Sequence, residues 1–512
     1  MNTKTARHVR FLYAGLFSAL AAADLGAQAL TNITSLYVSY ATRKNTVKPE
    51  GELKARLDTL EREFRAANSA GRTGEVRRLL AKGNALLANR PWTDVADYGS
   101  SLVLRSDRVV VESQKPYAVR LEQLYAPAID LTPALSAHAT LVRRASAGAM
   151  PEVVKDFGTF QGVSRDLKES PFGMELDARD VSDGRYIVTV EVKDSSRTLG
   201  TVALPIVLRK GIDDVVARFE REAATVPAAL RAEILYPVDR MRNVNRGRLE
   251  LRTLDVDADF AAADAVLAAV KSGKDPMMGR TGDLERHYTL EAASEVMPYH
   301  LYVPKGYSSQ KRYPLIIALH GLGGTEDAFF DGYGKKLPEL AETNGYIVAA
   351  PLGYRVDGFY GWGLGNPPAD YSDRRTQELS EKDVMQVLAE VKKLYSVDDN
   401  RTYLMGHSMG AIGTWRLAAK YPDIWAALGV FSGQGTPATL EKFRSIPEFV
   451  VHGDADPTVN VAGSRNMVAA MKPLGVDVTY IEVPGGNHSN VVEPNLAGMI
   501  KFFDAHSRSK KP

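Results

Sequence analysis

The chain contains 512 residues, of which 45% are hydrophobic and 25% are charged. This composition is typical of globular proteins, and the length allows several domains. Lys and Arg number 64 and Asp and Glu number 62, so no excess of positive charge is available to bind nucleic acid or an anionic membrane surface, and we expect neither partner. The absence of cysteine excludes disulfides, a catalytic thiol and thiolate metal sites.

The first residues have the pattern of a targeting segment. A basic start that includes Lys4, Arg7 and Arg10 precedes an apolar stretch at 11–23, and residues 27–29 offer a cleavage site flanked by small residues. As a helix the apolar stretch would span about 20 Å, whereas the core of a membrane is about 30 Å thick. A signal peptide at residues 1–29 is therefore favoured over a membrane anchor, and we expect a secreted or periplasmic protein.

The next part of the chain changes from helical to β periodicity. Across residues 53–88 apolar side chains recur at helical spacing on both sides of a break at 70–74, which predicts two helices within a helical segment at 30–99. From about residue 101 the period shifts towards two, most clearly at 183–192, which an Asp-Gly turn introduces. We predict an immunoglobulin-like β-sandwich at residues 100–211.

The second half of the chain is predicted to be a helical connector at 212–282 followed by an α/β domain at 283–512. In that domain nearly continuous apolar strands alternate with amphipathic helices, which is typical of a mostly parallel sheet with helices on both faces. The predicted strands are 313–319, 346–350, 402–405, 426–431, 448–452 and 477–483, and the predicted helices are 380–395, 410–420, 461–471 and 494–506. Ser380 and Asp383 resemble a capping box, which predicts that the first of these helices begins at Ser380.

A candidate nucleophile, Ser408, lies in the pentapeptide Gly-His-Ser-Met-Gly at residues 406–410. Alone, such a pentapeptide is a weak signal, but here a predicted strand precedes it and a predicted helix begins at once. In a strand-turn-helix of this kind the serine stands on a strained turn at the edge of the sheet, and small residues flank it because side chains would collide with neighbouring elements. At this point the chain resembles the α/β-hydrolase superfamily.

A serine hydroxyl needs a base to activate it, and the base needs an orienting acid. Candidates for both follow Ser408 in the chain: Asp454 and Asp456 come after the strand 448–452, and His488 comes after the strand 477–483. Because the carboxyl ends of parallel strands share one edge of a sheet, we expect them to lie beside Ser408. In the hydrolases that the chain resembles, the motif H-G-x-x-D-x-x-V carries the acid, which implies Asp456 as the acid, His488 as the base and Asp454 as a turn carboxylate.

A glycine-rich turn at 320–324 follows the strand 313–319 and is the candidate oxyanion hole. The backbone N–H groups of Leu322 and Met409 are predicted to donate to the oxyanion, each contributing about 3 kcal/mol to the barrier reduction. A phosphate-binding loop is excluded because no Lys-Ser/Thr pair follows the glycines. Four other histidines are expected to be structural, with His407 packing the turn around Ser408; the other three are His287, His300 and His452.

The stretch 302–307, the strand and glycine turn at 314–321 and the three candidate catalytic residues resemble feruloyl esterases and polyhydroxybutyrate depolymerase-like esterases, over about residues 283–507. This resemblance implies acyl transfer from a small-molecule or polymer-attached ester to water, without a metal or organic cofactor. The same core is similar to the catalytic domain of prolyl oligopeptidases, so a serine peptidase is the alternative. Those peptidases carry a β-propeller, and no blade repeat precedes this core. A non-enzymatic adhesion protein on this fold would be expected to have lost the serine or the histidine. Both residues are present here, which disfavours that alternative.

An aromatic stretch at 353–363 follows the strand 346–350, at the edge where substrates bind. Its aromatic side chains could line an acyl pocket, and Trp362 is the candidate substrate-binding residue. The alternative is that these side chains pack on the core. The sequence leaves open the acyl group, the oligomeric state and the role of the N-terminal half.

Overall fold

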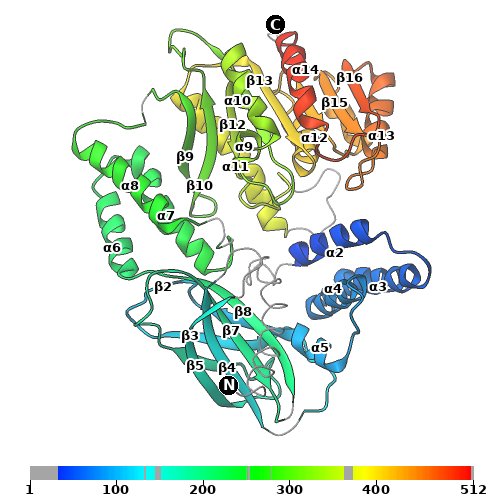
Figure 1. Cartoon of the computed structure of the whole chain (residues 1–512). Coiled ribbons are helices and arrows are strands. Elements are labelled where there is room, and N and C mark those ends of the chain that lie inside the picture. The colour runs from blue at the N-terminus through cyan, green and yellow to red at the C-terminus, as the bar shows by residue number, and fades with distance from the viewer. Residues whose placement is uncertain are drawn as a thin grey trace. The chain divides into compact units, whose positions relative to one another are not determined.

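The chain forms two compact units in a computed structural model (Figure 1). The first unit contains residues 1–222 and 237–259, and the second contains residues 223–236 and 260–512. The structure describes residues 33–131, 134–143, 151–195, 197–249, 251, 254–277, 279–361 and 373–508. The predicted signal peptide at 1–29 and Trp362 lie outside the described residues.

Helices open the described part of the first unit. They are α2 (Ile33–Val47), α3 (Gly51–Ser69), α4 (Thr73–Leu87) and α5 (Asp94–Ser101). The predicted pair of helices separated near residue 71 is confirmed as α3 and α4, whose buried side chains include Leu57 and Leu80, and Tyr40 of α2 packs against them. The sequence did not predict α5 separately, because its eight residues are too few to display a periodic apolar face.

Two sheets follow in the region for which the sequence predicts a β-sandwich. One has the order β1-β3-β6 and the other the order β2-β8-β7-β4-β5. Their bounds are β1 (Leu102–Ser106), β2 (Val110–Val111), β3 (Tyr117–Gln123), β4 (Leu135–Arg143), β5 (Glu152–Val163), β6 (Phe172–Leu176), β7 (Gly184–Lys193) and β8 (Thr198–Leu208). The strand predicted at 183–192 is confirmed as β7. In β3 the alternation places Tyr117, Val119 and Leu121 on the buried face.

In the sequence, helices occupy the stretch between β8 and the strands of the second unit. They are α6 (Ile212–Ala223), the short 3-10 helix η2 (Ala228–Leu230), α7 (Arg231–Asn245) and α8 (Val256–Lys271). The chain passes from one unit to the other three times, within α6, α7 and α8. None of the helices in the described part of the chain is long and apolar enough to cross a membrane.

The second unit is built on one sheet with the order β16-β15-β14-β13-β11-β12-β10-β9. Its strands are β9 (Gly282–Leu290), β10 (Glu295–Val303), β11 (Tyr313–Leu319), β12 (Ile347–Pro351), β13 (Val397–His407), β14 (Leu428–Phe431), β15 (Glu448–Gly453) and β16 (Val478–Val483). All neighbouring pairs from β12 to β16 are parallel, and β10 runs antiparallel to both β9 and β12. The predicted mostly parallel sheet is therefore confirmed, and the antiparallel pair β9 and β10 was not predicted.

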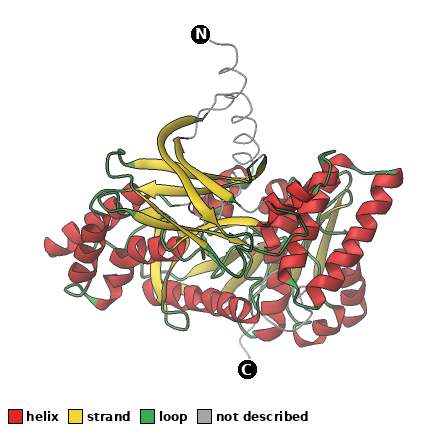
Figure 2. Cartoon of the chain, turned by 90° about the horizontal axis from the view of Figure 1, so that it is seen from below, coloured by secondary structure: helices red, strands yellow, loops and turns green. Residues whose placement is uncertain are grey.

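Helices cover both faces of this sheet (Figure 2). They are α9 (Ala328–Asp331), α10 (Lys336–Asn344), α11 (Arg374–Leu394), α12 (Met409–Lys420), α13 (Ala462–Met471) and α14 (Val492–Asp504), with the 3-10 helices η4 (Tyr333–Lys335), η5 (Pro437–Lys442) and η6 (Lys472–Leu474). Leu315 and Ile317 of β11 belong to a core that α11, α12 and α13 share, whereas Ile316 and Ala318 belong to a second core with α10 and α14. Burial on both faces explains why β11 reads as a continuous apolar run.

The predicted start of α11 is wrong. The helix begins at Arg374, and the side chain of Asp373 accepts a hydrogen bond from the N–H of Thr376, so Asp373 is the N-cap. Ser380 and Asp383 lie inside the helix and are buried, and both accept hydrogen bonds from backbone N–H groups of the loop that follows β12. They were mistaken for a cap because a polar pair that binds a neighbouring loop has the same residue types as a capping pair.

Glu448, the first residue of β15, is a buried carboxyl group without a charged partner in the described part of the chain. It accepts a hydrogen bond from Nε1 of Trp415 at 2.6 Å, and its other oxygen has no hydrogen-bond partner there. Burial raises the pKa of Glu448 to about 8 from an ordinary value of 4.5. The carboxyl group is therefore protonated in the folded chain over a pH range in which the unfolded chain would ionise it.

We expect the free energy of unfolding to fall as the pH rises from 5 to 8, on the order of 1 kcal/mol per pH unit from this group. The sign follows from the raised pKa: the stabilisation is complete below the unfolded pKa and is lost as the pH approaches the folded one. Urea denaturation at pH 5 and pH 8 should show a smaller fall for Glu448→Gln, which keeps an acceptor for Trp415. The exposed Glu441, paired with Arg444, provides the control Glu441→Gln. Equal pH dependence in both variants would contradict the assignment.

Candidate active site

Ser408 stands on a sharp turn between β13 and α12. Its backbone has φ 57° and ψ −116°, a left-handed conformation that is strained for a residue with a side chain. A Cβ atom at Gly406 would lie 2.2 Å from the carbonyl carbon of Gly410, and one at Gly410 would lie 1.9 Å from the carbonyl oxygen of Leu319. Both flanking positions therefore require glycine, which accounts for the pentapeptide in physical terms.

The structure brings Ser408, His488 and Asp456 together in one hydrogen-bonded row. Nε2 of His488 lies 2.8 Å from Oγ of Ser408, and Nδ1 of His488 lies 2.7 Å from Oδ2 of Asp456. The carboxylate only accepts, so Nδ1 carries the hydrogen and Nε2 is free to accept the serine proton. The Asp456 side chain is fully buried and the His488 side chain is 16% exposed. The row can therefore pass a proton from Ser408 to His488 while the acid stays shielded from water.

Two glycines bring the loops of the acid and the base into contact. A Cβ atom at Gly453, the last residue of β15, would lie 2.2 Å from the carbonyl oxygen of Gly486. Asp454 does not contact His488 but accepts a hydrogen bond from the N–H of Gly485 at 2.6 Å, so the predicted turn carboxylate is confirmed. Side chains at 453 or 486 would push the two loops apart, and His488 would then lose its contact with Asp456.

Asp456 is held as a carboxylate by four donors. Its Oδ1 accepts from the N–H groups of Thr458 at 2.8 Å and Val459 at 3.0 Å, and its Oδ2 lies near both His488 and His452. Burial by itself would raise the pKa of Asp456, but the hydrogen bonds from the two histidines and the two amides outweigh burial and hold the pKa well below its ordinary range. The acid therefore stays ionised throughout the neutral range.

His452 was expected to be structural, but it contacts the acid directly. Its Nε2 lies 3.2 Å from Oδ2 of Asp456 and 3.0 Å from the carbonyl oxygen of Val459. Both oxygens only accept, so Nε2 carries a hydrogen and donates between them. On the other side of the ring, Nδ1 lies 2.8 Å from Oγ of Ser464. The available signal was the spacing of four residues between His452 and Asp456, which places the acid on the loop just beyond the end of the strand that carries His452.

The glycine-rich turn passes directly over Ser408. A Cβ atom at Gly321 would lie 3.2 Å from Cβ of Ser408. Gly324 closes the turn by donating to the carbonyl oxygen of Gly321 at 2.9 Å. Leu322 lies within this turn and Met409 is the first residue of α12, where backbone amides have no partner in the helix. Neither amide donates a hydrogen bond to another residue among those that the structure describes, so both are available to an incoming oxygen.

The aromatic loop after β12 holds the glycine turn from behind. The carbonyl oxygen of Val356 accepts from the N–H of Gly323 at 2.8 Å, and the hydroxyl of Tyr360 donates to the carbonyl oxygen of His320 at 3.1 Å. Tyr354, Phe359 and Tyr360 all have left-handed φ values, and their side chains are buried in the core. For these three side chains the alternative reading, packing on the core, is confirmed.

Arg416 of α12 fixes the end of the same loop. The buried guanidinium donates through Nη1 to the carbonyl oxygens of Phe359 at 2.7 Å and Gly361 at 2.6 Å. Burial lowers the pKa of Arg416 to about 10, which still leaves the group charged at neutral pH. A buried charged donor therefore offsets part of the strain of three left-handed residues and keeps the loop in one conformation.

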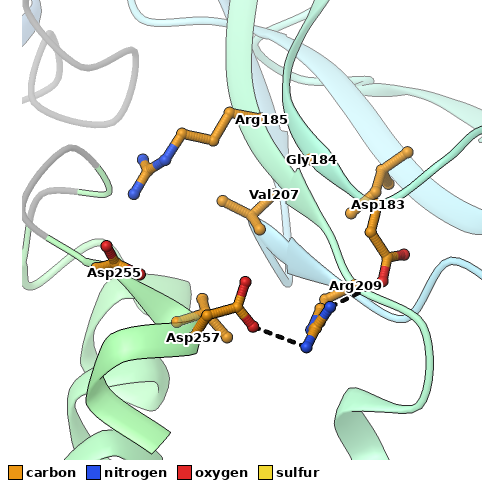
Figure 3. A pocket seen from close by; sticks show the side chains of 9 residues that line it. Asp183, Gly184, Arg185, Val207, Arg209, Asp255 and Asp257 are labelled. Atoms are coloured by element: carbon orange, nitrogen blue, oxygen red, sulfur yellow. Dashed lines mark hydrogen bonds and ion pairs between the residues drawn. The ribbon is translucent and has the colours of Figure 1, made fainter. Parts of the chain in front are cut away.

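A pocket in the first unit does not belong to this site. It encloses about 200 Å³, which is less than most ligand pockets, and its lining includes Asp183, Arg185, Arg209 and Asp257 (Figure 3). Arg209 pairs with Asp183 at 3.1 Å and with Asp257 at 2.7 Å, so both carboxylates already have a cationic partner. The row of Ser408, His488 and Asp456 lies wholly in the second unit. In the described part of the chain no group of three or more His, Asp or Glu side chains is arranged to hold a metal ion.

Comparison with known proteins finds similarity to esterases in the part of the chain that carries this site. Residues 291–471 match the family model described as "Putative esterase". Among curated proteins, a feruloyl esterase B of Thermothelomyces thermophilus is 31% identical over 134 residues, or 26% of this chain and 43% of that protein. A cutinase of Thermobifida cellulosilytica is 33% identical over 122 residues, or 22% of this chain and 45% of that protein.

A third relative, a bifunctional acetylxylan esterase/xylanase of Neocallimastix patriciarum, is 27% identical over 161 residues, or 31% of this chain and 22% of that protein. The chain thus spans less than half the length of each of these relatives. The matched residues contain the glycine turn, the Ser408 turn and the loop of Asp456, and they lie within the helix-covered parallel sheet. Through this part of its length, the chain is similar to esterases.

Proposed function

We propose that this protein is a serine carboxylic ester hydrolase in which Ser408 is the nucleophile, His488 the general base and Asp456 the acid that orients the base. One observation carries the proposal: the row from Oγ of Ser408 to Nε2 of His488 at 2.8 Å and from Nδ1 of His488 to Asp456 at 2.7 Å. This geometry matches what a hydroxyl needs in order to attack a carbonyl near neutral pH. The strained turn under Ser408 supports it, because the turn presents the hydroxyl to His488 at the end of the strand.

The reaction proceeds in two acyl-transfer steps. Oγ of Ser408 attacks the ester carbonyl carbon while Nε2 of His488 takes the hydroxyl proton, and the resulting oxyanion accepts hydrogen bonds from the N–H groups of Leu322 and Met409. The intermediate collapses with loss of the alcohol, which receives its proton from His488, and an acyl group remains on Ser408. Water then attacks this acyl group as His488 takes its proton, which releases the carboxylic acid and restores the serine hydroxyl.

The substrate class is a carboxylic ester of a small alcohol or of a polymer-attached hydroxyl. The named relatives are a feruloyl esterase, an acetylxylan esterase and a cutinase, and these names share the ester bond but not the acyl group. A panel of acetyl, butyryl and feruloyl esters and of proline-containing peptides tests the class. We expect turnover of at least one ester and none of the peptides. Cleavage of the peptide amides alone would overturn the proposal in favour of a prolyl-specific peptidase.

Export is part of the proposal, because the substrates of such an enzyme include polymers outside the cell. The sequence of residues 1–29 supports export through its basic start, apolar stretch and small-residue cleavage site. We expect the protein recovered from the periplasm or medium of a producing cell to begin at Leu30, as measured by intact mass. Recovery of a chain that still begins at Met1 would contradict the cleavage.

A further inference from the structure

His407, the residue before the nucleophile, is buried and lies between two partners. Its Nε2 is 2.8 Å from the backbone carbonyl oxygen of His488, and its Nδ1 is 2.8 Å from the hydroxyl of Tyr333 in η4. The rings of His407 and His488 are 4.7 Å apart between centroids. The proposed reaction does not use the imidazole of His407, because Nε2 and Nδ1 both face groups other than Ser408.

The two contacts define one tautomer. A carbonyl oxygen only accepts, so Nε2 of His407 must donate its hydrogen to His488. Nδ1 then carries a lone pair and accepts from the hydroxyl of Tyr333. Burial raises the pKa of Tyr333 to about 12, which keeps its hydroxyl protonated, and burial lowers the pKa of His407 to about 4, which keeps its ring neutral. The hydrogen bonds therefore run in one direction, from Tyr333 through His407 to His488.

The loop that carries His488 has few other restraints near the catalytic ring. Within the described part of the chain, the carbonyl group of His488 accepts no hydrogen bond except that from His407. The neighbouring Asn487 and Ser489 are exposed, and their amides bond only within the loop. A shift of this backbone by about 1 Å would move Nε2 of His488 out of hydrogen-bonding distance of Ser408, and displacements of that size cost about 100-fold in rate.

We propose that His407 is a positioning residue that fixes the main chain of the base at His488, and that Tyr333 holds His407 in the tautomer that can do so. The inference rests on the proposed function, because that function gives His488 its role. The proposed function also gives a reason for the neutral ring of His407. His488 becomes a cation during the reaction, and a second cation with its ring centroid 4.7 Å away would oppose that charge.

Three variants test the proposal by steady-state hydrolysis of a short-chain p-nitrophenyl ester. His407→Phe keeps a ring but removes the donor, His407→Gln keeps a side-chain N–H donor, and Tyr333→Phe removes only the hydroxyl. We expect kcat to fall about 10- to 100-fold in His407→Phe with KM within about twofold, most of the loss to be recovered in His407→Gln, and a fall of a few-fold in Tyr333→Phe. Adding Tyr333→Phe to His407→Phe should lower kcat no further, since the chain of bonds is already broken.

The rate at which a fluorophosphonate labels Ser408 gives a second readout that is independent of the acyl group. In this reaction Oγ of Ser408 forms a bond to phosphorus as fluoride leaves, and His488 takes the hydroxyl proton. The labelling rates of the variants should rank as their kcat values do, with thermal unfolding midpoints close to that of the wild type. If the wild type is labelled but hydrolyses no ester, the proposed function fails while the positioning claim is still decided by the labelling rates.

Three results would each overturn the positioning claim. The first is a folded His407→Phe that reacts with the fluorophosphonate at the wild-type rate. The second is a loss in His407→Phe that appears in KM rather than kcat, and the third is a loss that His407→Gln does not recover. If His407→Phe does not fold, the labelling rate of Tyr333→Phe decides the claim. Labelling of Tyr333→Phe at the wild-type rate would contradict the proposal that Tyr333 positions His488 through the tautomer of His407.

Discussion

Ser408→Ala lowers kcat for a short-chain p-nitrophenyl ester by about 10⁴- to 10⁶-fold in this account, because no other hydroxyl stands on the turn beneath the glycine loop. Steady-state kinetics with the purified variant measures the loss. The thermal unfolding midpoint should change little, since the variant removes only one oxygen from the side chain. The exposed Ser309 provides the matched control, and Ser309→Ala should keep wild-type kinetics. Near-normal turnover by Ser408→Ala would contradict the assignment of the nucleophile.

Asp456→Asn should lower kcat by about 10³- to 10⁴-fold, because a neutral amide no longer selects the tautomer of His488 or stabilises its cation. Asp454→Asn changes the charge in the same way two residues earlier and is the matched control. It keeps an oxygen that can accept from Gly485, so we expect a loss of less than about tenfold. Parallel kinetics of the two variants decides between the two carboxylates, and damage confined to Asp454→Asn would reverse the assignment.

The parallel strands of the second unit could be predicted closely, because burial on both faces gives each strand a nearly continuous run of apolar residues. The strand expected at 313–319 is β11 with the same two bounds, and every other predicted strand of this sheet overlaps an observed one. The pair β9 and β10 was missed, since the buried face of β9 includes Gly282 and Arg286, which interrupt the apolar alternation that predicts a strand. The start of α11 was predicted six residues too late, because Ser380 serves a distant loop that local sequence cannot reveal.

The candidate site could be predicted where the order of the strands in the chain determines which loops meet. Parallel strands end at one edge, so residues that follow β13, β15 and β16 were expected to meet, and Ser408, Asp456 and His488 do lie in one row. The contacts of His407 were not predictable, because they depend on how η4 and the loop of His488 pack around the turn of Ser408. Trp362 stays a prediction as a substrate-binding residue.

Rapid-quench mass spectrometry of the acyl-enzyme tests whether Ser408 is the nucleophile. The chain is mixed with excess p-nitrophenyl acetate, quenched in acid during the first turnover and digested with trypsin. We expect one acetyl group on the peptide 402–416, located at Ser408, formed together with one equivalent of p-nitrophenol and absent from Ser408→Ala. Turnover without acetylation of this peptide, or an acetyl group that accumulates kinetically on another residue, would contradict this role of Ser408.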